Sequence, residues 1–231
     1  MTFQRFTPLL LAACCAAAFS TPAAAQQKAK NIIFFLGDGM GPSVITAARI
    51  HRGGEDSLLH FERLMERTAR IKTYSLDYQT TDSAPSMGAY MTGVKMNNDV
   101  ISQAGARPID PTKEGVDMCG ANNGTPAVTI LELAKAQGKA TGAITTTELT
   151  HATPASTFAH TCSRDAVYTI AQQIVPGGAG YNKALGDGVD VLMGGGRNHF
   201  TPRDAATNPK GRPAGRDLMA EFAGAGYYVA G

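Results

Sequence analysis

The hydrophobic positions along the chain follow two patterns that alternate. Short apolar or β-branched runs, each typical of a strand, cover residues 31–36, 68–74, 139–147, 189–193 and 227–229. Between them, helical spacing of the apolar residues predicts helices that begin at Pro42 or cover residues 83–93, 126–137, 165–175 and 215–223. Strands that alternate with helices favour an α/β fold in three layers, with helices on both faces of a mostly parallel sheet.

This fold class indicates where chemistry should lie. Ligands of such sheets bind beyond the carboxyl ends of the strands, so the loops after residues 36 and 147 and the start of the helix at Ser83 are the places to search. The long segment 96–123 is rich in Asn, Gly and Pro, and we expect it to run over the surface.

The first 25 residues are typical of a secretory signal peptide. A single Arg5 precedes a short apolar run, and Ala23, Ala24 and Ala25 form the small-residue cleavage site. The run is too short to span a membrane. We therefore expect a periplasmic or secreted protein whose mature part is residues 26–231, with no transmembrane segment. The alternative is a lipid-anchored form, since residues 11–14 resemble a lipoprotein cleavage box.

Composition argues against nucleic-acid binding and leaves open whether the mature chain contains a disulfide. The net charge is only +2 and Trp is absent, so the chain carries no signature of nucleic-acid binding. After removal of the signal peptide, Cys119 and Cys162 are the remaining cysteines. Their spacing does not suit a thiolate zinc site, and in an oxidising compartment they either pair or stay free.

Two loops offer an oxygen ligand and a nucleophile. Gly37-Asp38-Gly39 follows the first predicted strand, so Asp38 either binds a hard cation or caps the following helix. Ser83 stands at the start of the helix that ends at Gly93, where free N–H groups attract an anion that the hydroxyl could attack. An ordinary helix cap is the alternative. No Gly-x-Ser-x-Gly elbow is present, so activation of the serine by a metal is the remaining route.

A third loop follows the strand at residues 139–147. His151 and Thr153 alternate and can face one direction; a Thr hydroxyl is an acceptable Mg²⁺ ligand, whereas His151 would act through water. Arg164, shortly downstream, has the planar guanidinium that grips two phosphate oxygens. Singly, each of these residues also fits an ordinary loop or helix start.

Together these segments resemble the alkaline phosphatase family. The resemblance rests on residues 34–41, on Thr81-Asp82-Ser83-Ala84, on residues 92–95 and 151–155, and on Asp190-Val191-Leu192-Met193 with the glycines that follow. It covers essentially the whole mature chain, with the motifs in the family's order.

The resemblance implies a role for each candidate. Ser83 would form a phosphoserine, and Arg164 would hold the phosphate. Asp38 and Thr153 would bind metal. His151 would bind metal through water, because it stands where some members have Asp and others have His. Two zinc ions and one magnesium ion would be the cofactors, small phosphate monoesters the substrates, and a homodimer the assembly.

The family's later metal ligands would follow Gly231, so we expect this chain to be the incomplete, N-terminal part of the catalytic domain. By itself it should have little activity, because a zinc site needs about three protein ligands. Two alternatives stay open. A sulfatase-like hydrolase would share Ser83-Ala84-Pro85-Ser86 but has Arg where this chain has Met87. A non-catalytic chain would merely bind phosphate or Mg²⁺.

Overall fold

The protein is described by a computed structural model over residues 29–110, 115–213 and 215–230. The chain divides into two units, residues 1–40 and residues 41–231. The predicted signal peptide lies outside the described residues. Within the described ranges, no helix combines the length and the apolar character that crossing a bilayer requires.

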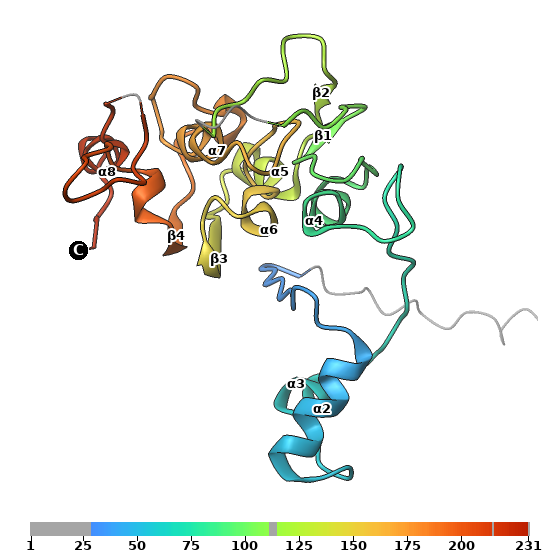
Figure 1. Ribbon diagram of the computed structural model, residues 1–231. Coiled ribbons are helices and arrows are strands. Elements are labelled where there is room, and N and C mark those ends of the chain that lie inside the picture. The colour runs from blue at the N-terminus through green and yellow to red at the C-terminus, as the bar shows by residue number, and fades with distance from the viewer. Residues whose placement is uncertain (1–28, 111–114, 214, 231) are drawn as a thin grey trace, which may run out of the picture. The chain divides into compact units, whose positions relative to one another are not determined.

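The second unit holds all the helices and strands described here (Figure 1). The α-helices are α2 (Pro42–Gly53), α3 (His60–Leu64), α4 (Ser83–Thr92), α5 (Ile130–Ala136), α6 (Ala152–Ala155), α7 (Val167–Gln173) and α8 (Leu218–Gly224). Two 3₁₀ turns, η1 (Lys183–Leu185) and η2 (Arg197–His199), follow α7 and β4. The strands are β1 (Gln103–Ala104), β2 (Thr125–Pro126), β3 (Gly142–Glu148) and β4 (Val191–Gly195).

Local signals explain the end of α4 and the start of α5. α4 ends because Gly93 adopts a left-handed conformation, with φ of 73°, that a side chain would disfavour. The helix predicted over residues 126–137 is shorter at its start: Thr129 caps α5 by accepting from the Glu132 N–H, and the Glu132 carboxylate accepts from the Thr129 N–H. This capping box outweighs Pro126, which lies in β2 instead.

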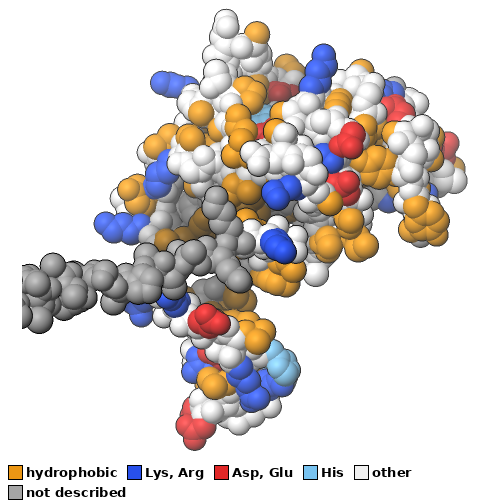
Figure 2. All heavy atoms as spheres, turned by 180° about the vertical axis from the view of Figure 1, so that it is seen from behind, with side chains coloured by type: hydrophobic (Ala, Val, Ile, Leu, Met, Phe, Trp, Pro, Cys, Tyr) orange, Lys and Arg blue, Asp and Glu red, His pale blue; other side chains and the backbone are white. Residues whose placement is uncertain are grey.

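The strands form two pairs. β1 and β2 are antiparallel, whereas β3 and β4 run parallel, with Ala143 opposite Leu192 and Ile144 opposite Met193. The parallel pair confirms the predicted strands over residues 139–147 and 189–193. Ile144 and Met193 are 70% and 58% exposed, among many apolar side chains that reach the surface (Figure 2).

Three of the predicted strands are absent from the described residues. Residues 31–36, 68–74 and 227–229 take no strand conformation. A strand needs a neighbour that pairs with its backbone, and a local apolar pattern does not supply one. The apolar side chains of residues 32–36 are accordingly exposed.

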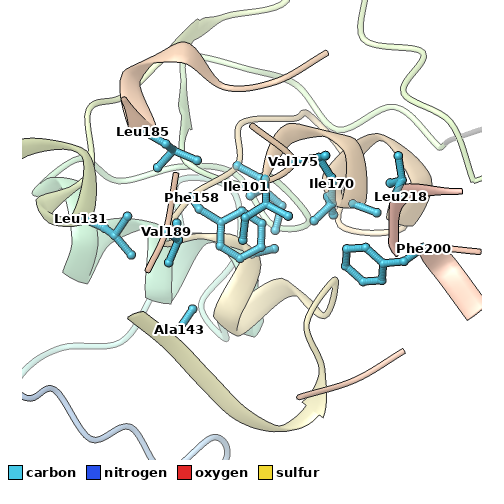
Figure 3. Packing of buried hydrophobic residues seen from close by; sticks show 14 of the residues in the cluster. Ile101, Leu131, Ala143, Phe158, Ile170, Val175, Leu185, Val189, Phe200 and Leu218 are labelled. Atoms are coloured by element: carbon cyan, nitrogen blue, oxygen red, sulfur yellow. The ribbon is translucent and has the colours of Figure 1, made fainter. Parts of the chain in front are cut away.

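The main hydrophobic core lies in the second unit, around Phe158 (Figure 3). Phe158, Ile101 and Ile170 are fully buried there, and Leu131 is the buried apolar side chain of α5, whereas Ile130 and Leu133 are half exposed. Figure 3 shows that Phe158 lies among side chains from segments far apart in the sequence.

The segment 96–123 is only in part the surface loop that its composition predicts: most described residues from 107 to 122 are exposed, whereas residues 96–106 are largely buried. Met96, Val100 and Ala106 are buried and form a second apolar cluster with Cys119 and Cys162. The backbone of this segment pairs as well, because Ile101 exchanges both backbone hydrogen bonds with Thr161, at 2.9 and 3.0 Å. Tertiary pairing therefore overrides the turn-rich composition over residues 96–106.

Candidate active site

Ser83 is the first residue of α4, and Asp82 is its extended N-cap residue, with ψ of 179°. Ala84, Met87 and Met91 bury one side of α4 and so fix its direction. The N–H groups of the first helical turn have no intrahelical acceptors, and the helix dipole adds positive character there. The structure thus places the predicted nucleophile, half-buried, at an end of a helix that favours an anion.

Arg164 reaches this helix end from 82 residues farther along the chain. Its Nη1 donates to Asp82 Oδ2 at 2.7 Å in an ion pair whose two side chains are about a fifth exposed. Its Nη2 lies 3.4 Å from His151 Nε2. The guanidinium is therefore held beside Ser83 by a carboxylate on the preceding residue, and it retains N–H donors for an anion.

His151 and Thr153 lie at the start of α6, immediately after the carboxyl end of β3. His151 is the N-cap residue of α6, and its backbone N–H donates to the Glu148 carbonyl oxygen at 2.9 Å. Ser156, at the other end of α6, donates its hydroxyl to the Ala84 carbonyl oxygen at 3.2 Å, which ties α6 to α4. This placement after a parallel strand is the one that the α/β pattern predicts.

The His151 side chain has one nitrogen with an unmet hydrogen bond. Its Nδ1 is buried and has no hydrogen-bond partner among the described residues, whereas Nε2 faces Arg164. A buried polar atom without a partner is costly, so it indicates a place where a water or another ligand completes the hydrogen bonds.

Asp38 belongs to the first unit. Asp38 and Gly39 form a turn, closed by a hydrogen bond of 3.2 Å from the Met40 N–H to the Gly37 carbonyl oxygen, and Gly39 has φ of 64°. The glycine beside Asp38 thus permits a sharp turn, and Asp38 stands exposed in it.

Cys119 and Cys162 form a disulfide, with 5.6 Å between their Cα atoms. This resolves the alternative that the sequence left open in favour of pairing. Because Cys162 stands two residues before Arg164, the disulfide anchors the segment that carries the Arg164 side chain.

Comparison with known proteins supplies the family. The family model described as alkaline phosphatase matches residues 29–230. The chain belongs to the alkaline phosphatase family.

Relatives of known function cover most of the chain. The tissue-nonspecific alkaline phosphatase of Gallus gallus is 37% identical over 77% of this chain and 35% of its own length. The alkaline phosphatase of Gadus morhua is 35% identical over 84% of this chain and 43% of its own. The chain thus spans less than half of the length of these relatives.

Solved alkaline phosphatases share the α/β fold. The Thermus thermophilus enzyme matches with a TM-score of 0.58 at 32% identity, over 80% of this chain and 32% of its own. A mutant of the alkaline phosphatase from the Antarctic bacterium TAB5, solved with magnesium bound, matches with a TM-score of 0.57 at 25% identity, over 81% of this chain and 43% of its own. The fold predicted from the alternation of strands and helices is confirmed.

Sequence reasoning missed two acidic residues beside Arg164. Asp82 stood inside the motif Thr81-Asp82-Ser83-Ala84 but was given no role, although it makes the ion pair that places the guanidinium. Asp99 lies in the segment taken for a surface loop, and no local signal marks it. Desolvation by the surrounding protein and the Asp82 carboxylate raise the pKa of the Asp99 carboxyl.

The residues described here fit part of a metal centre. The Thr153 hydroxyl and the imidazole of His151, whose Nδ1 is unsatisfied, are suitable for a hydrated hard cation. By contrast, the groups of three or more His, Cys, Asp or Glu ligands found in the described ranges reduce to Asp117 with Cys119 and Cys162, and both cysteines are bound in the disulfide. No closed zinc site of three such ligands exists within those ranges.

Proposed function

We propose that this chain supplies the nucleophile and the phosphate-binding arginine of an alkaline phosphatase that hydrolyses small phosphate monoesters. One observation carries the proposal: the Asp82–Arg164 ion pair of 2.7 Å brings the guanidinium to the helix end that presents Ser83. Backbone N–H groups, an arginine and a hydroxyl converge there, which is the set of groups that binding and attack of a phosphate require.

The chemistry proceeds in two displacements. Arg164 and the first turn of α4 hold the phosphate oxygens while Ser83 Oγ bonds to phosphorus and the bond to the alcohol oxygen breaks. The alcohol leaves with a proton. Water then attacks the phosphoserine, which releases inorganic phosphate and restores the serine. Through both displacements Arg164 holds the phosphoryl oxygens at a fixed position and balances their negative charge.

A metal-dependent reaction fits the site residues. Thr153 and, through water, His151 are the residues of the second unit that we assign to a magnesium ion. Asp38, in the first unit, is a separate candidate metal ligand, and two zinc ions would be held with further ligands. Such cations supply positive charge that stabilises the alkoxide of a serine and the departing oxygen. The magnesium-bound TAB5 mutant, at 25% identity, supports a metal in this family fold.

A sulfatase-like reaction is the second candidate, and the surroundings of Met87 disfavour it. The sulfatase pattern requires Arg at this position, whereas Met87 is buried in α4 and contributes no charge. Turnover of an aryl phosphate against the corresponding aryl sulfate separates the two reactions.

The disulfide supports export. Disulfides persist in oxidising compartments, so Cys119–Cys162 agrees with removal of residues 1–25 and a periplasmic or secreted location for residues 26–231. N-terminal sequencing of the protein from its natural cell tests the cleavage site, and a homodimer, the further family expectation, is tested by sedimentation.

The decisive experiment traps the phosphoserine in protein expressed from its full reading frame. Labelled phosphate should attach to the wild type but not to Ser83→Ala, whose kcat/KM should fall by about 10³-fold or more because no other group replaces the nucleophile. Arg164→Ala should weaken inhibition by inorganic phosphate by about 10- to 100-fold, because a charge-assisted bidentate contact is lost.

Ser86→Ala is the matched control. Ser86 stands one turn farther along α4 and donates its hydroxyl to the Asp82 carbonyl oxygen at 2.8 Å, so its loss perturbs the helix start without removing the nucleophile. This variant should still take the label. Labelled Ser83→Ala protein would show that another residue is the nucleophile.

A further inference from the structure

Asp99 has an unusual backbone. Its φ is 68°, in the left-handed region that most side chains avoid and that Asp and Asn tolerate better than others. Ser102, three residues later, is the other described non-glycine residue with positive φ. A strained residue of this kind persists where the surrounding contacts hold it. The contacts of Asp99 therefore indicate what role this residue has in the structure.

Both backbone groups of Asp99 serve the site. Its N–H points at the Asp82 carboxylate, 3.3 Å from each oxygen, and its carbonyl oxygen accepts from the Arg164 N–H at 2.7 Å. One residue therefore contacts both partners of the ion pair beside Ser83. The pairing of Ile101 with Thr161 continues this contact along the two segments.

We propose that Asp99 is a positioning residue for Arg164, acting through its left-handed backbone rather than through its carboxylate. The inference rests on the proposed function, in which Arg164 holds the phosphate. Asp82 occupies Nη1 of the guanidinium, so the remaining N–H groups face an anion correctly only if the Asp82 carboxylate and the Arg164 backbone keep their places. Asp99 fixes both at once.

The side chain of Asp99 argues for the backbone role. Its carboxyl lies beside the Asp82 carboxylate, and desolvation together with this like charge raises the pKa of Asp99. The attraction of the Arg164 guanidinium opposes this rise but does not cancel it, so the negative charge of Asp99 is held at an unfavourable place. What the position requires is a residue that tolerates positive φ, a requirement that Asn and Gly also meet.

Hydrogen exchange of the 231-residue chain tests the positioning contact without any assay of activity. Asp99→Val places a β-branched side chain at positive φ and should raise exchange in residues 161–166, which contain the Arg164 amide, by about tenfold or more. Asp99→Gly and Asp99→Asn keep the conformation accessible and should match the wild type. Asp165→Val is the matched control, because it removes a neighbouring carboxylate at a residue without positive φ.

Kinetics of the protein from its full reading frame test the consequence for the site. Asp99→Val should raise KM for a phosphate monoester and the inhibition constant of inorganic phosphate by about tenfold each, with a smaller change in kcat, while Gly and Asn at this position restore both. A general loss of folding would instead reduce the fraction of active enzyme and leave KM unchanged.

Two results would overturn the inference. Equal exchange in Asp99→Val and wild type would show that the backbone contact does not depend on this conformation. Equal losses in the Gly, Asn and Val variants would assign the effect to the carboxylate. If the wild type lacks phosphatase activity altogether, the proposed function fails, and the exchange comparison still decides whether Asp99 positions Arg164.

Discussion

Two neighbouring parts of the second unit differ sharply in how they bury apolar side chains. Around Phe158 and Ile170 the core excludes solvent completely, whereas in the β3–β4 pair Ala143 is buried and most other residues are exposed. Ala143 is buried and Leu192 packs against the core, while Ile144 and Met193, the next pair in register, are exposed. Alternation along the strands therefore divides the sheet into a packed and a bare face.

The site depends on the packed part. α4 presents Ser83, and α6 follows the carboxyl end of β3, but both helices are held by buried residues and by the bond between Ser156 and Ala84. The exposed face of β3 and β4 contributes no contact to the Asp82–Arg164 pair. The contacts around Ser83 and Arg164 and the bare sheet face can therefore be perturbed separately.

Removing the aromatic side chain at the centre of the core should lower stability more than any other change considered below. Phe158→Ala should lower the free energy of unfolding by about 4 kcal/mol, because a fully buried ring leaves a cavity. Ile144→Ala on the bare face should cost less than about 1 kcal/mol, since its side chain already meets water. Urea unfolding of both variants measures the contrast, and equal losses would show that the bare face is covered in solution.

The disulfide should rank next. Removing it by the double change Cys119→Ser and Cys162→Ser should cost about 3 kcal/mol, because the bond closes a loop of 43 residues in the unfolded chain. The same bond lies in the second apolar cluster, two residues from Arg164, so phosphate binding should weaken as well. Thermal unfolding with and without reductant checks the stability, and a melting temperature that ignores reductant would contradict a structural disulfide.

The sequence marks candidate site residues but not the contacts between them. Ser83, Thr153 and Arg164 could be proposed because each stands at a strand end or a helix start with a known chemical preference. Asp99 could not, since its role depends on a left-handed backbone that no Gly marks and on pairing with a segment 65 residues away. Long-range contacts of this kind leave no local pattern.

The fold shows the same division. The α/β class and the β3–β4 strands follow from periodicity, and the end of α4 follows from Gly93. The start of α5 was placed too early because Pro126 was preferred over the Thr129–Glu132 capping box. The runs over residues 31–36 and 227–229 have the composition of strands, but composition does not provide the partner that a strand requires.

The smallest expected effect concerns a buried carboxylate on α5. Burial alone would raise the pKa of Glu132, but the hydrogen bonds from His160, the Thr129 N–H and Asn182 outweigh it and lower this pKa below its ordinary value of 4.5. A carboxyl whose pKa falls on folding stabilises the folded state above the unfolded value, and this contribution disappears as pH falls through the folded pKa.

Glu132→Gln should therefore cost about 1–3 kcal/mol at pH 7 and flatten the loss of stability of the wild type below about pH 4.5. Lys135→Met, on the same helix, is the matched control. Lys135 pairs with the exposed carboxylates of Asp187 and Asp190, so losing these ion pairs should cost less than about 1 kcal/mol, and this cost should shrink further in salt. Urea unfolding from pH 3 to 7 separates the two. If Lys135→Met changed the pH profile as much as Glu132→Gln, the charges near the β3–β4 pair would matter as much as the buried network, and the two parts of the unit would not be separable.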